Sequence, residues 1–209
     1  MREQQDTLRL KLPAAFDWSV NLGYLARSPQ ECMHEVRGGT VRKALLVGNR
    51  RFLVELAAPD MNFPGNSFPS GTLSDNAMPD NGFLSVRFLN GTPSEAECEA
   101  VAAYIREWFD LDRDLAAFYR MAEEDGLLRE AVRRFRGLRL IGMPDLFEAL
   151  CWSIIGQQIS LSAAYAIKRR FVDAFGDTLE EQGRTYRIFP SCERIARLAP
   201  ADLAAGKLS

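Results

Sequence analysis

The sequence has one histidine, His34, and its four cysteines form no Cys-x-x-Cys pair. Zinc sites are usually built from several such ligands at short spacing, so no metal ion is expected. His34 lies in a segment typical of a strand, and we expect it to be structural rather than a catalytic base. No cofactor is expected either.

The sequence also lacks a strong charge of either sign, with 26 Lys and Arg against 28 Asp and Glu. The total charge therefore gives no indication of nucleic acid, although contact with DNA depends on a local basic face. No apolar run reaches about 18 residues, so no membrane span is expected. Residues 1–6 are polar and acidic, whereas a signal peptide needs a basic start and an apolar stretch. We expect a cytoplasmic protein.

The first half of the chain is typical of a β-sheet interrupted by helices. Alternating apolar residues and Gly-rich turns predict strands, whose ranges are 7–12, 33–36, 41–47, 51–57 and 83–89. Helices are predicted over 17–27 and after Thr92, with Thr92 as cap and Glu95 completing a capping box. Residues 58–82 are rich in Gly, Pro, Ser and Asn, which predicts a mobile loop, poorly ordered at its centre.

The second half has the three- and four-residue periodicity of helices. Longer helices are predicted over 112–124, 127–135, 146–155 and 161–175, and short helical turns near 192–198 and 200–205. Only 184–189 is expected to be extended. The predicted class is therefore α+β, with an antiparallel sheet domain over 1–110 and an all-helical domain over 111–209.

The helix over 146–155 has a clear start and a clear apolar face. Asp145 and Glu148 have the spacing of a capping box, in which each side chain binds an unpaired backbone N–H. The apolar stripe of this helix consists of Leu146, Leu150 and Ile154. Phe147 and Cys151 broaden it, and Cys151 is expected to behave as a small hydrophobic residue.

Two adjacent glutamines follow at a corner between helices. Gly156 is expected to end the first helix in a left-handed conformation, and Ser160 can cap the second helix. Gln157 and Gln158 therefore lie at a rigid elbow. Structural scaffolds rarely need two large amides at such a corner, whereas proteins that contact bases or backbones often do.

Five sequence blocks carry a resemblance to a known family. They are Phe-Asp-Trp-Ser at 16–19, Leu-Gly-Tyr-Leu-Ala-Arg at 22–27, Phe-Glu-Ala at 147–149, Ile-Ile-Gly-Gln-Gln-Ile-Ser at 154–160, and Phe-Pro at 189–190 followed by Glu-Arg-Ile-Ala at 193–196. Together they resemble the bacterial inducible DNA-3-methyladenine glycosylase II family of the helix-hairpin-helix glycosylase superfamily. The resemblance implies a TATA-binding-protein-like sheet with two helices, followed by a helical glycosylase domain.

One departure from the family limits what the resemblance implies. In the family, a Gly-rich hairpin and a catalytic aspartate follow well downstream of the Gly-Gln-Gln block, but no Leu-Pro-Gly-Ile-Gly-like motif occurs in this sequence. The resemblance therefore places the catalytic residue beyond Ser209, and no acidic residue of this chain is assigned to that role. We expect an incomplete helix-hairpin-helix domain, inactive alone, from a shortened protein, a truncated reading frame or a split protein.

The resemblance also implies roles for three side chains. Gln158 matches the residue that enters the DNA in place of the flipped base; alternatively, it is an ordinary exposed amide. Gln157 would line the edge of the base pocket, or else bind backbone at the helix end. Tyr24 matches an aromatic residue at the pocket border, and a plain interdomain core aromatic is the alternative.

Two basic clusters are candidates for contacts with DNA phosphates. One consists of Arg133, Arg134, Arg136 and Arg139, and the other of Lys168, Arg169 and Arg170, expected on the outer face of the helix 161–175. A solvated surface is the alternative for both. Ser160 is a helix cap first, but the backbone N–H groups beside it could also hold a phosphate.

The predicted function is DNA base-excision repair. The resemblance implies hydrolysis of the N-glycosidic bond of alkylated purines of the 3-methyladenine type after base flipping, by a monomer acting on damaged double-stranded DNA. One alternative is a noncatalytic DNA-binding or interaction module. Another is a regulatory fusion of this family with an upstream methyltransferase or transcription-factor domain, but the short N-terminus argues against it.

Overall fold

A computed structural model of the chain describes residues 7–58 and 82–205. The loop predicted over 58–82 lies outside these residues except at its two ends. Within them, no helix is long and apolar enough to cross a membrane.

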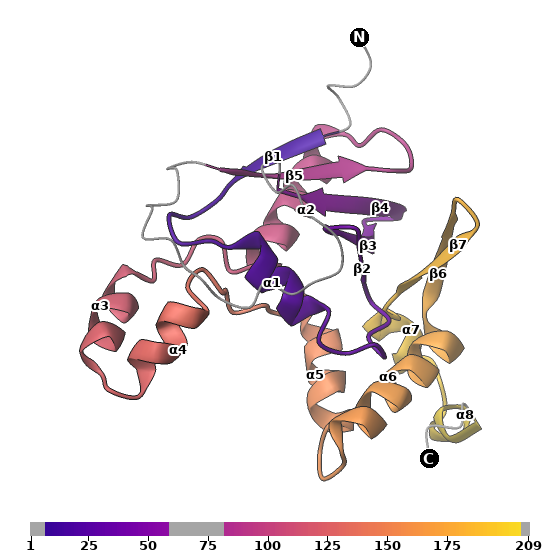
Figure 1. The fold of residues 1–209 in the computed structure, drawn as a ribbon. Coiled ribbons are helices and arrows are strands. Elements are labelled where there is room, and N and C mark those ends of the chain that lie inside the picture. The colour runs from indigo at the N-terminus through magenta and orange to yellow at the C-terminus, as the bar shows by residue number, and fades with distance from the viewer. Residues whose placement is uncertain (1–6, 59–81, 206–209) are drawn as a thin grey trace.

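A five-stranded antiparallel sheet forms the first half of the molecule (Figure 1). Its order across the sheet is β1 (Thr7–Lys11), β5 (Phe83–Phe88), β4 (Arg50–Ala57), β3 (Thr40–Val47) and β2 (Glu35–Arg37). The turns predicted at Gly38-Gly39 and Gly48-Asn49 join β2 to β3 and β3 to β4, and Gly38, Gly39 and Gly48 take positive φ. The predicted strands are confirmed, with their ends moved by a residue or two.

Two helices cover one face of this sheet, as predicted. They are α1 (Trp18–Leu25) and α2 (Glu95–Trp108). Alternate side chains of the strands point toward these helices, and the most deeply buried members of this core are Val41, Phe52, Val54, Leu56, Leu84, Val86, Val101, Ile105 and Phe109. Trp18 is 2% exposed and donates its ring N–H to the carbonyl of Gly39, so it belongs to this core.

The N-terminus of α2 lies two residues later than predicted. Ser94, not Thr92, is the N-cap, and its hydroxyl accepts the N–H of Glu97 while the Glu97 carboxylate accepts the N–H of Ser94. The capping box therefore exists, but it is Ser94 with Glu97 rather than Thr92 with Glu95. Both pairs have the spacing of a capping box, so the sequence alone does not show which of them caps the helix.

The second half of the chain is mainly helical. Its helices are α3 (Ala116–Glu124), α4 (Leu128–Arg134), α5 (Leu146–Ile155), α6 (Leu161–Phe175), α7 (Cys192–Ala196) and α8 (Pro200–Ala205). Figure 1 shows α3 and α4 side by side and α5 and α6 meeting at a sharp turn. The α+β class and the order of a sheet followed by helices are confirmed.

The prediction that residues 111–209 are all helical is wrong at one place. Strands β6 (Asp177–Glu181) and β7 (Arg184–Ile188) form a hairpin, and Gln182 and Gly183 between them have φ of 51° and 73°. Such a two-residue turn matches the twist of paired strands. Leu179, Tyr186 and Ile188 of the hairpin pack against Ala44 and Leu53 on the second face of the sheet. The domain boundary near residue 110 stays a prediction.

Asn21 joins the two halves of the chain. Its side chain is fully buried, donates to the carbonyl of Gly137 over 2.9 Å and accepts the N–H of Arg139 over 3.0 Å. Gly137 has φ of 85°, and a Cβ there would lie 2.5 Å from the nitrogen of Asp17. Only glycine therefore allows this loop to approach α1 so closely.

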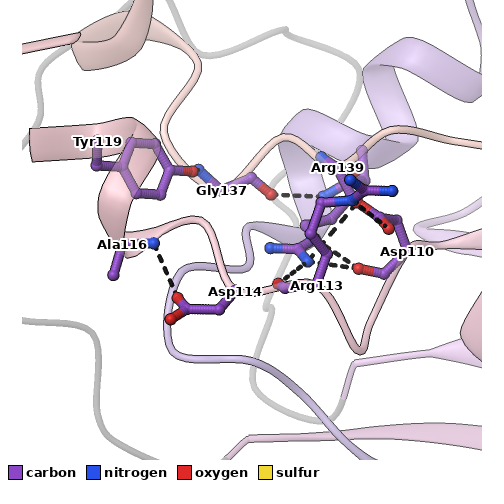
Figure 2. Close-up of polar contacts among 8 residues, drawn as sticks. Asp110, Arg113, Asp114, Ala116, Tyr119, Gly137 and Arg139 are labelled. Atoms are coloured by element: carbon purple, nitrogen blue, oxygen red, sulfur yellow. Dashed lines mark hydrogen bonds and ion pairs between the residues drawn. The ribbon is translucent and has the colours of Figure 1, made fainter. Parts of the chain in front are cut away.

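Arg139 is buried in the same joint, which corrects its prediction as a phosphate contact. The side chain is 3% exposed, and its Nε donates to the carbonyl of Asp110 over 3.0 Å. Figure 2 shows the guanidinium directed at Asp110 and Arg113. Both residues contribute their backbone carbonyls and follow the C-terminus of α2. Arg139 therefore joins the loop before α5 to the loop after α2.

We expect Asn21→Ala to lower the free energy of unfolding by about 2–3 kcal/mol, because the buried N–H of Arg139 loses its acceptor. Urea denaturation measures this change. Asn49→Ala, at the exposed turn between β3 and β4, is the matched control and should change the stability by less than about 1 kcal/mol. Equal effects of the two substitutions would contradict the role of Asn21 as a joint.

Candidate functional site

The site region begins with the capped N-terminus of α5. The carboxylate of Asp145 accepts the N–H of Glu148 over 2.9 Å, so the predicted N-cap is confirmed. The reciprocal half of the predicted capping box is wrong. The Glu148 carboxylate instead accepts from the ammonium of Lys168 over 2.7 Å, because a buried lysine competes for it.

The apolar stripe of α5 points into solvent. The side chains of Leu146, Leu150 and Ile154 are 72%, 53% and 68% exposed. Leu161, at the start of α6, is 60% exposed. The period of the stripe is as predicted, but no element of the described chain covers it. An exposed apolar surface of this kind marks a face that binds another molecule or another part of the protein.

The turn between α5 and α6 differs in its backbone from the predicted one. Gly156 has φ of −74° and continues the helical turn, so the expected left-handed glycine is wrong. Gln158 takes the left-handed conformation instead, with φ of 58°. Ser160 then caps α6, as predicted, by accepting the N–H of Ala163 over 3.2 Å. A non-glycine residue in this region stores strain of about 1–3 kcal/mol, and such residues cluster at functional sites.

Both glutamines of the elbow present their amides to solvent. Gln157 and Gln158 are exposed, and neither side chain makes a hydrogen bond to protein within residues 7–58 and 82–205. The alternative in which the Gln157 amide binds the helix end is therefore not seen. Each amide keeps its two N–H donors and its carbonyl acceptor available for a ligand.

Tyr24 lies in the last turn of α1 with its ring 37% exposed. The guanidinium of Arg27 stacks on this ring, with 3.9 Å from its central carbon to the ring centroid, and donates to the Tyr24 carbonyl over 2.9 Å. This ring is therefore not a plain core aromatic. Its face already attracts a cation, as the quadrupole of an aromatic ring does.

A small cavity lies between the two halves of the chain. It has a volume of about 60 Å³, and its lining includes Tyr24, Lys43, Tyr104, Glu148 and Lys168. At about 30 Å³ for each water molecule, two waters would fill it, so it is too small for a purine. Tyr24 thus borders an interdomain cavity, whereas Gln157 and Gln158 do not line it. Their assignments to wedge and pocket stay predictions.

The prediction that Lys168 contacts the DNA backbone is wrong. Its side chain is 3% exposed and lies on the inner face of α6 with Ala164, Tyr165, Phe171 and Val172. The helical period places residues three and four apart on one face, so Lys168 shares the face of Ala164 and Tyr165. The lysine was assigned to the outer face because it is charged.

The neighbouring Arg169 is exposed, as expected of a backbone contact. It lines a groove of about 350 Å³ between β7 and the segment before β2, together with Arg184 and Arg187. Ser160 is exposed and acts as a helix cap, and its proposed contact with phosphate stays a prediction.

Two other titratable side chains near the site, His34 and Cys32, are uncharged at neutral pH. Burial lowers the pKa of His34 to about 4, and its Nε2 lies 3.2 Å from the carbonyl of Leu25. Burial and the charge of Glu31 raise the pKa of the Cys32 thiol to about 11. At neutral pH His34 is therefore uncharged and Cys32 protonated. Among the described residues, no group of three or more His, Cys, Asp or Glu could hold a metal ion.

The fold is that of DNA glycosylases. It matches a 3-methyladenine DNA glycosylase from Archaeoglobus fulgidus with a TM-score of 0.69 and 24% identity, over 97% of this chain and 62% of that one. It also matches an 8-oxoguanine glycosylase/lyase from Clostridium acetobutylicum, solved with double-stranded DNA, with a TM-score of 0.57 and 15% identity over 99% and 61%. A family model for the N-terminal domain of 8-oxoguanine DNA glycosylase matches residues 72–150.

Sequence similarity points to one group of DNA glycosylases. The chain is 44% identical to a DNA-3-methyladenine glycosylase of Bacillus subtilis over 209 residues, which is 99% of this chain and 62% of that protein. The predicted resemblance to the bacterial DNA-3-methyladenine glycosylases is confirmed. The chain thus spans about three fifths of that relative's length.

We expect Gln158→Gly to raise the free energy of unfolding by about 0.5–1 kcal/mol, because glycine adopts the left-handed backbone without steric cost. Urea denaturation tests this. Gln182→Gly, at the other exposed glutamine with positive φ, should behave alike. A loss of stability at Gln158 alone would mean that its side chain makes a stabilising contact.

Proposed function

We propose that this chain is the DNA-opening part of a glycosylase that removes alkylated purines of the 3-methyladenine type. The observation that carries the proposal is the elbow between α5 and α6, where two exposed amides follow a rigid helix and have no hydrogen-bond partner among residues 7–58 and 82–205. The 44% identity to a named DNA-3-methyladenine glycosylase supports the same activity.

In this proposal Gln158 is the wedge. A glycosylase must take its target base out of the stack, at a cost of a few kcal/mol in lost stacking and pairing. An inserted glutamine fills the resulting gap, and its amide can donate to and accept from the base left without a partner. The strained backbone of Gln158 supports this role, because its φ of 58° lies in the left-handed region and such non-glycine residues cluster at functional sites.

Gln157 and Tyr24 would contribute to the pocket for the extruded base. Alkylation at a ring nitrogen gives the purine a positive charge, and an aromatic ring attracts such a base by about 1–2 kcal/mol where water is excluded. The guanidinium of Arg27 occupies one face of the Tyr24 ring, so in this proposal the base uses the opposite face or displaces Arg27. The present cavity of about 60 Å³ has to widen before a purine enters.

Ser160 and Arg169 are the proposed contacts to the DNA backbone. Ser160 lies at the N-terminus of α6, where backbone N–H groups and the helix dipole favour a phosphate. Arg169 is exposed and has no carboxylate within 4.0 Å among the described residues. Lys168 has no part in this contact.

The chemical step needs a carboxylate to stabilise the cationic transition state, and the resemblance puts that residue beyond Ser209. We therefore expect the 209 residues to bind damaged duplex without releasing a base. A monomeric state and a cytoplasmic location remain predictions from the sequence.

We expect Gln158→Ala to weaken binding to a duplex with one abasic site at least fivefold, because the gap in the stack is no longer filled. Fluorescence anisotropy with a labelled duplex measures the dissociation constant. The control is Gln182→Ala, which removes the same side chain from an exposed position with the same left-handed backbone. Equal affinities of the two variants would exclude Gln158 as the wedge.

The exposed stripe of α5 favours a second candidate, a noncatalytic DNA-binding or interaction module. Leu146, Leu150 and Ile154 would bind a partner rather than a further part of a glycosylase. The proposed enzyme and this module differ in whether the completed protein releases a base.

To separate them, the remaining two fifths of the Bacillus subtilis relative can be fused after Ser209. We expect the fusion to release 3-methyladenine from alkylated duplex in a single turnover, and the 209 residues alone to release none. Chromatography of the free base measures release. A folded fusion that binds the duplex without releasing base would favour the noncatalytic module.

A further inference from the structure

The buried cation of α6 lies where three separate parts of the chain meet. The ammonium of Lys168 is 2.7 Å from the carboxylate of Glu148 on α5 and 3.9 Å from that of Glu31, in the segment between α1 and β2. The side chains of Lys168 and Glu148 are 3% and 7% exposed. Such a charge is tolerated only when paired, so the pair constrains where both helices lie.

Glu31 links this pair to the N-terminal half. Its carboxylate accepts the N–H groups of Cys32 and Met33, each over 2.8 Å, and so fixes the turn that leads into β2. Burial by itself would raise the pKa of Glu31, but the charge of Lys168 and these N–H groups lower it. Glu31 therefore stays ionised and available to Lys168 at neutral pH.

Apolar contacts hold one side of α5. Phe147 and Cys151 are partly buried against a cluster that includes Phe171 and Phe189, and the rings of Phe147 and Trp152 lie 6.0 Å and 4.9 Å from those of Phe189 and Tyr165. Glu148 is the one residue of this helix that is buried, while its apolar stripe is exposed. The ion pair therefore adds a directional contact to a helix that apolar packing holds on a single side.

We propose that Lys168 is a positioning residue that sets the α5–α6 elbow, and with it Gln158, at a fixed place relative to Tyr24 at the end of α1. Lys168 lies eight residues beyond Ser160, about 12 Å along a rigid helix. A displacement at the pair is therefore transmitted to the tip of the elbow. Lys168 acts through Glu148 and Glu31 and touches no DNA. This inference rests on the proposed function.

The test compares Lys168→Met with Lys168→Arg in binding to two duplexes, one with an abasic site and one undamaged. We expect Lys168→Met to weaken binding to the abasic duplex at least tenfold and to the undamaged duplex less than twofold. Lys168→Arg, which keeps the charge, should restore abasic binding to within threefold of the original protein.

Arg169→Met is the matched control, because it removes one positive charge from the same helix at an exposed position. It should weaken both duplexes alike and reduce the slope of log K against log salt, as loss of a phosphate contact does. Lys168→Met should leave that slope unchanged. A reduced slope, or equal weakening of both duplexes, in Lys168→Met would overturn the proposal.

Removal of one charge leaves Glu148 buried without a partner, and this variant can fail to fold. The double variant Glu148→Leu with Lys168→Met removes both charges together, and we expect it to fold and to lose at least tenfold in abasic binding. Retained abasic binding in a folded double variant would overturn the positioning role.

Hydrogen exchange keeps the two proposals separable. If the unchanged protein does not distinguish the abasic duplex from the undamaged one, the proposed function fails. Hydrogen exchange at residues 156–160 then tests the positioning role by itself. Loss of the Glu148–Lys168 pair should accelerate exchange there at least tenfold, while β3 and β4 stay protected. Unchanged exchange at the elbow would contradict the positioning role.

Discussion

The ion pair between Glu148 and Lys168 is the contact on which the arrangement of the second half depends. It joins the two helices that form the elbow, and through Glu31 it reaches the turn that leads into the sheet. The exposed stripe of α5 contributes no packing among the described residues. The position of the elbow is therefore set by this ion pair together with the packing of Phe147 and Cys151 against the cluster that contains Phe171.

Such a contact adds more to specificity than to stability. The desolvation of two charges offsets much of their attraction, so an apolar pair of similar volume is often equally stable. An apolar pair, however, tolerates small shifts in angle and register, whereas a hydrogen-bonded ion pair requires one geometry. In the proposed function, the side chain of Gln158 enters the gap left by one flipped base, and this requires the same accuracy of placement.

Much of this architecture follows from local sequence. Strand alternation, Gly-rich turns and helix caps such as Asp145 and Ser160 depend on near neighbours, and they are found where they were predicted. The cap of α2 was misplaced because two local motifs overlap there, whereas the errors at Lys168 and Glu148 arise from an interaction between distant residues. Lys168 looked like a surface residue because its partner Glu148 lies twenty positions away, and Glu148 looked like half of a capping box for the same reason.

The Gly-Gln-Gln motif correctly predicted where the elbow lies, but the backbone conformation predicted for it was wrong. A glycine beside a turn suggested that Gly156 would be left-handed, but Gln158 is. Local propensity favours glycine there, and only the path of the chain into α6 decides otherwise. The extended segment predicted over 184–189 is found as β7, but its partner β6 was missed although Gln182-Gly183 is a suitable two-residue turn. The reason is that β6 holds few apolar residues and gains its burial from the sheet.

The hairpin also has a consequence for how the chain is made on the ribosome. Tyr186 binds Arg42 across 144 positions, and Arg184 pairs with Glu35 across 149. At about 5–20 residues per second, β3 and β4 emerge roughly 10–30 s before β7 can cover their second face. During that interval Ala44 and Leu53 stay open to solvent on a newly formed sheet, so nascent chains are most exposed to self-association before residue 188 is synthesised.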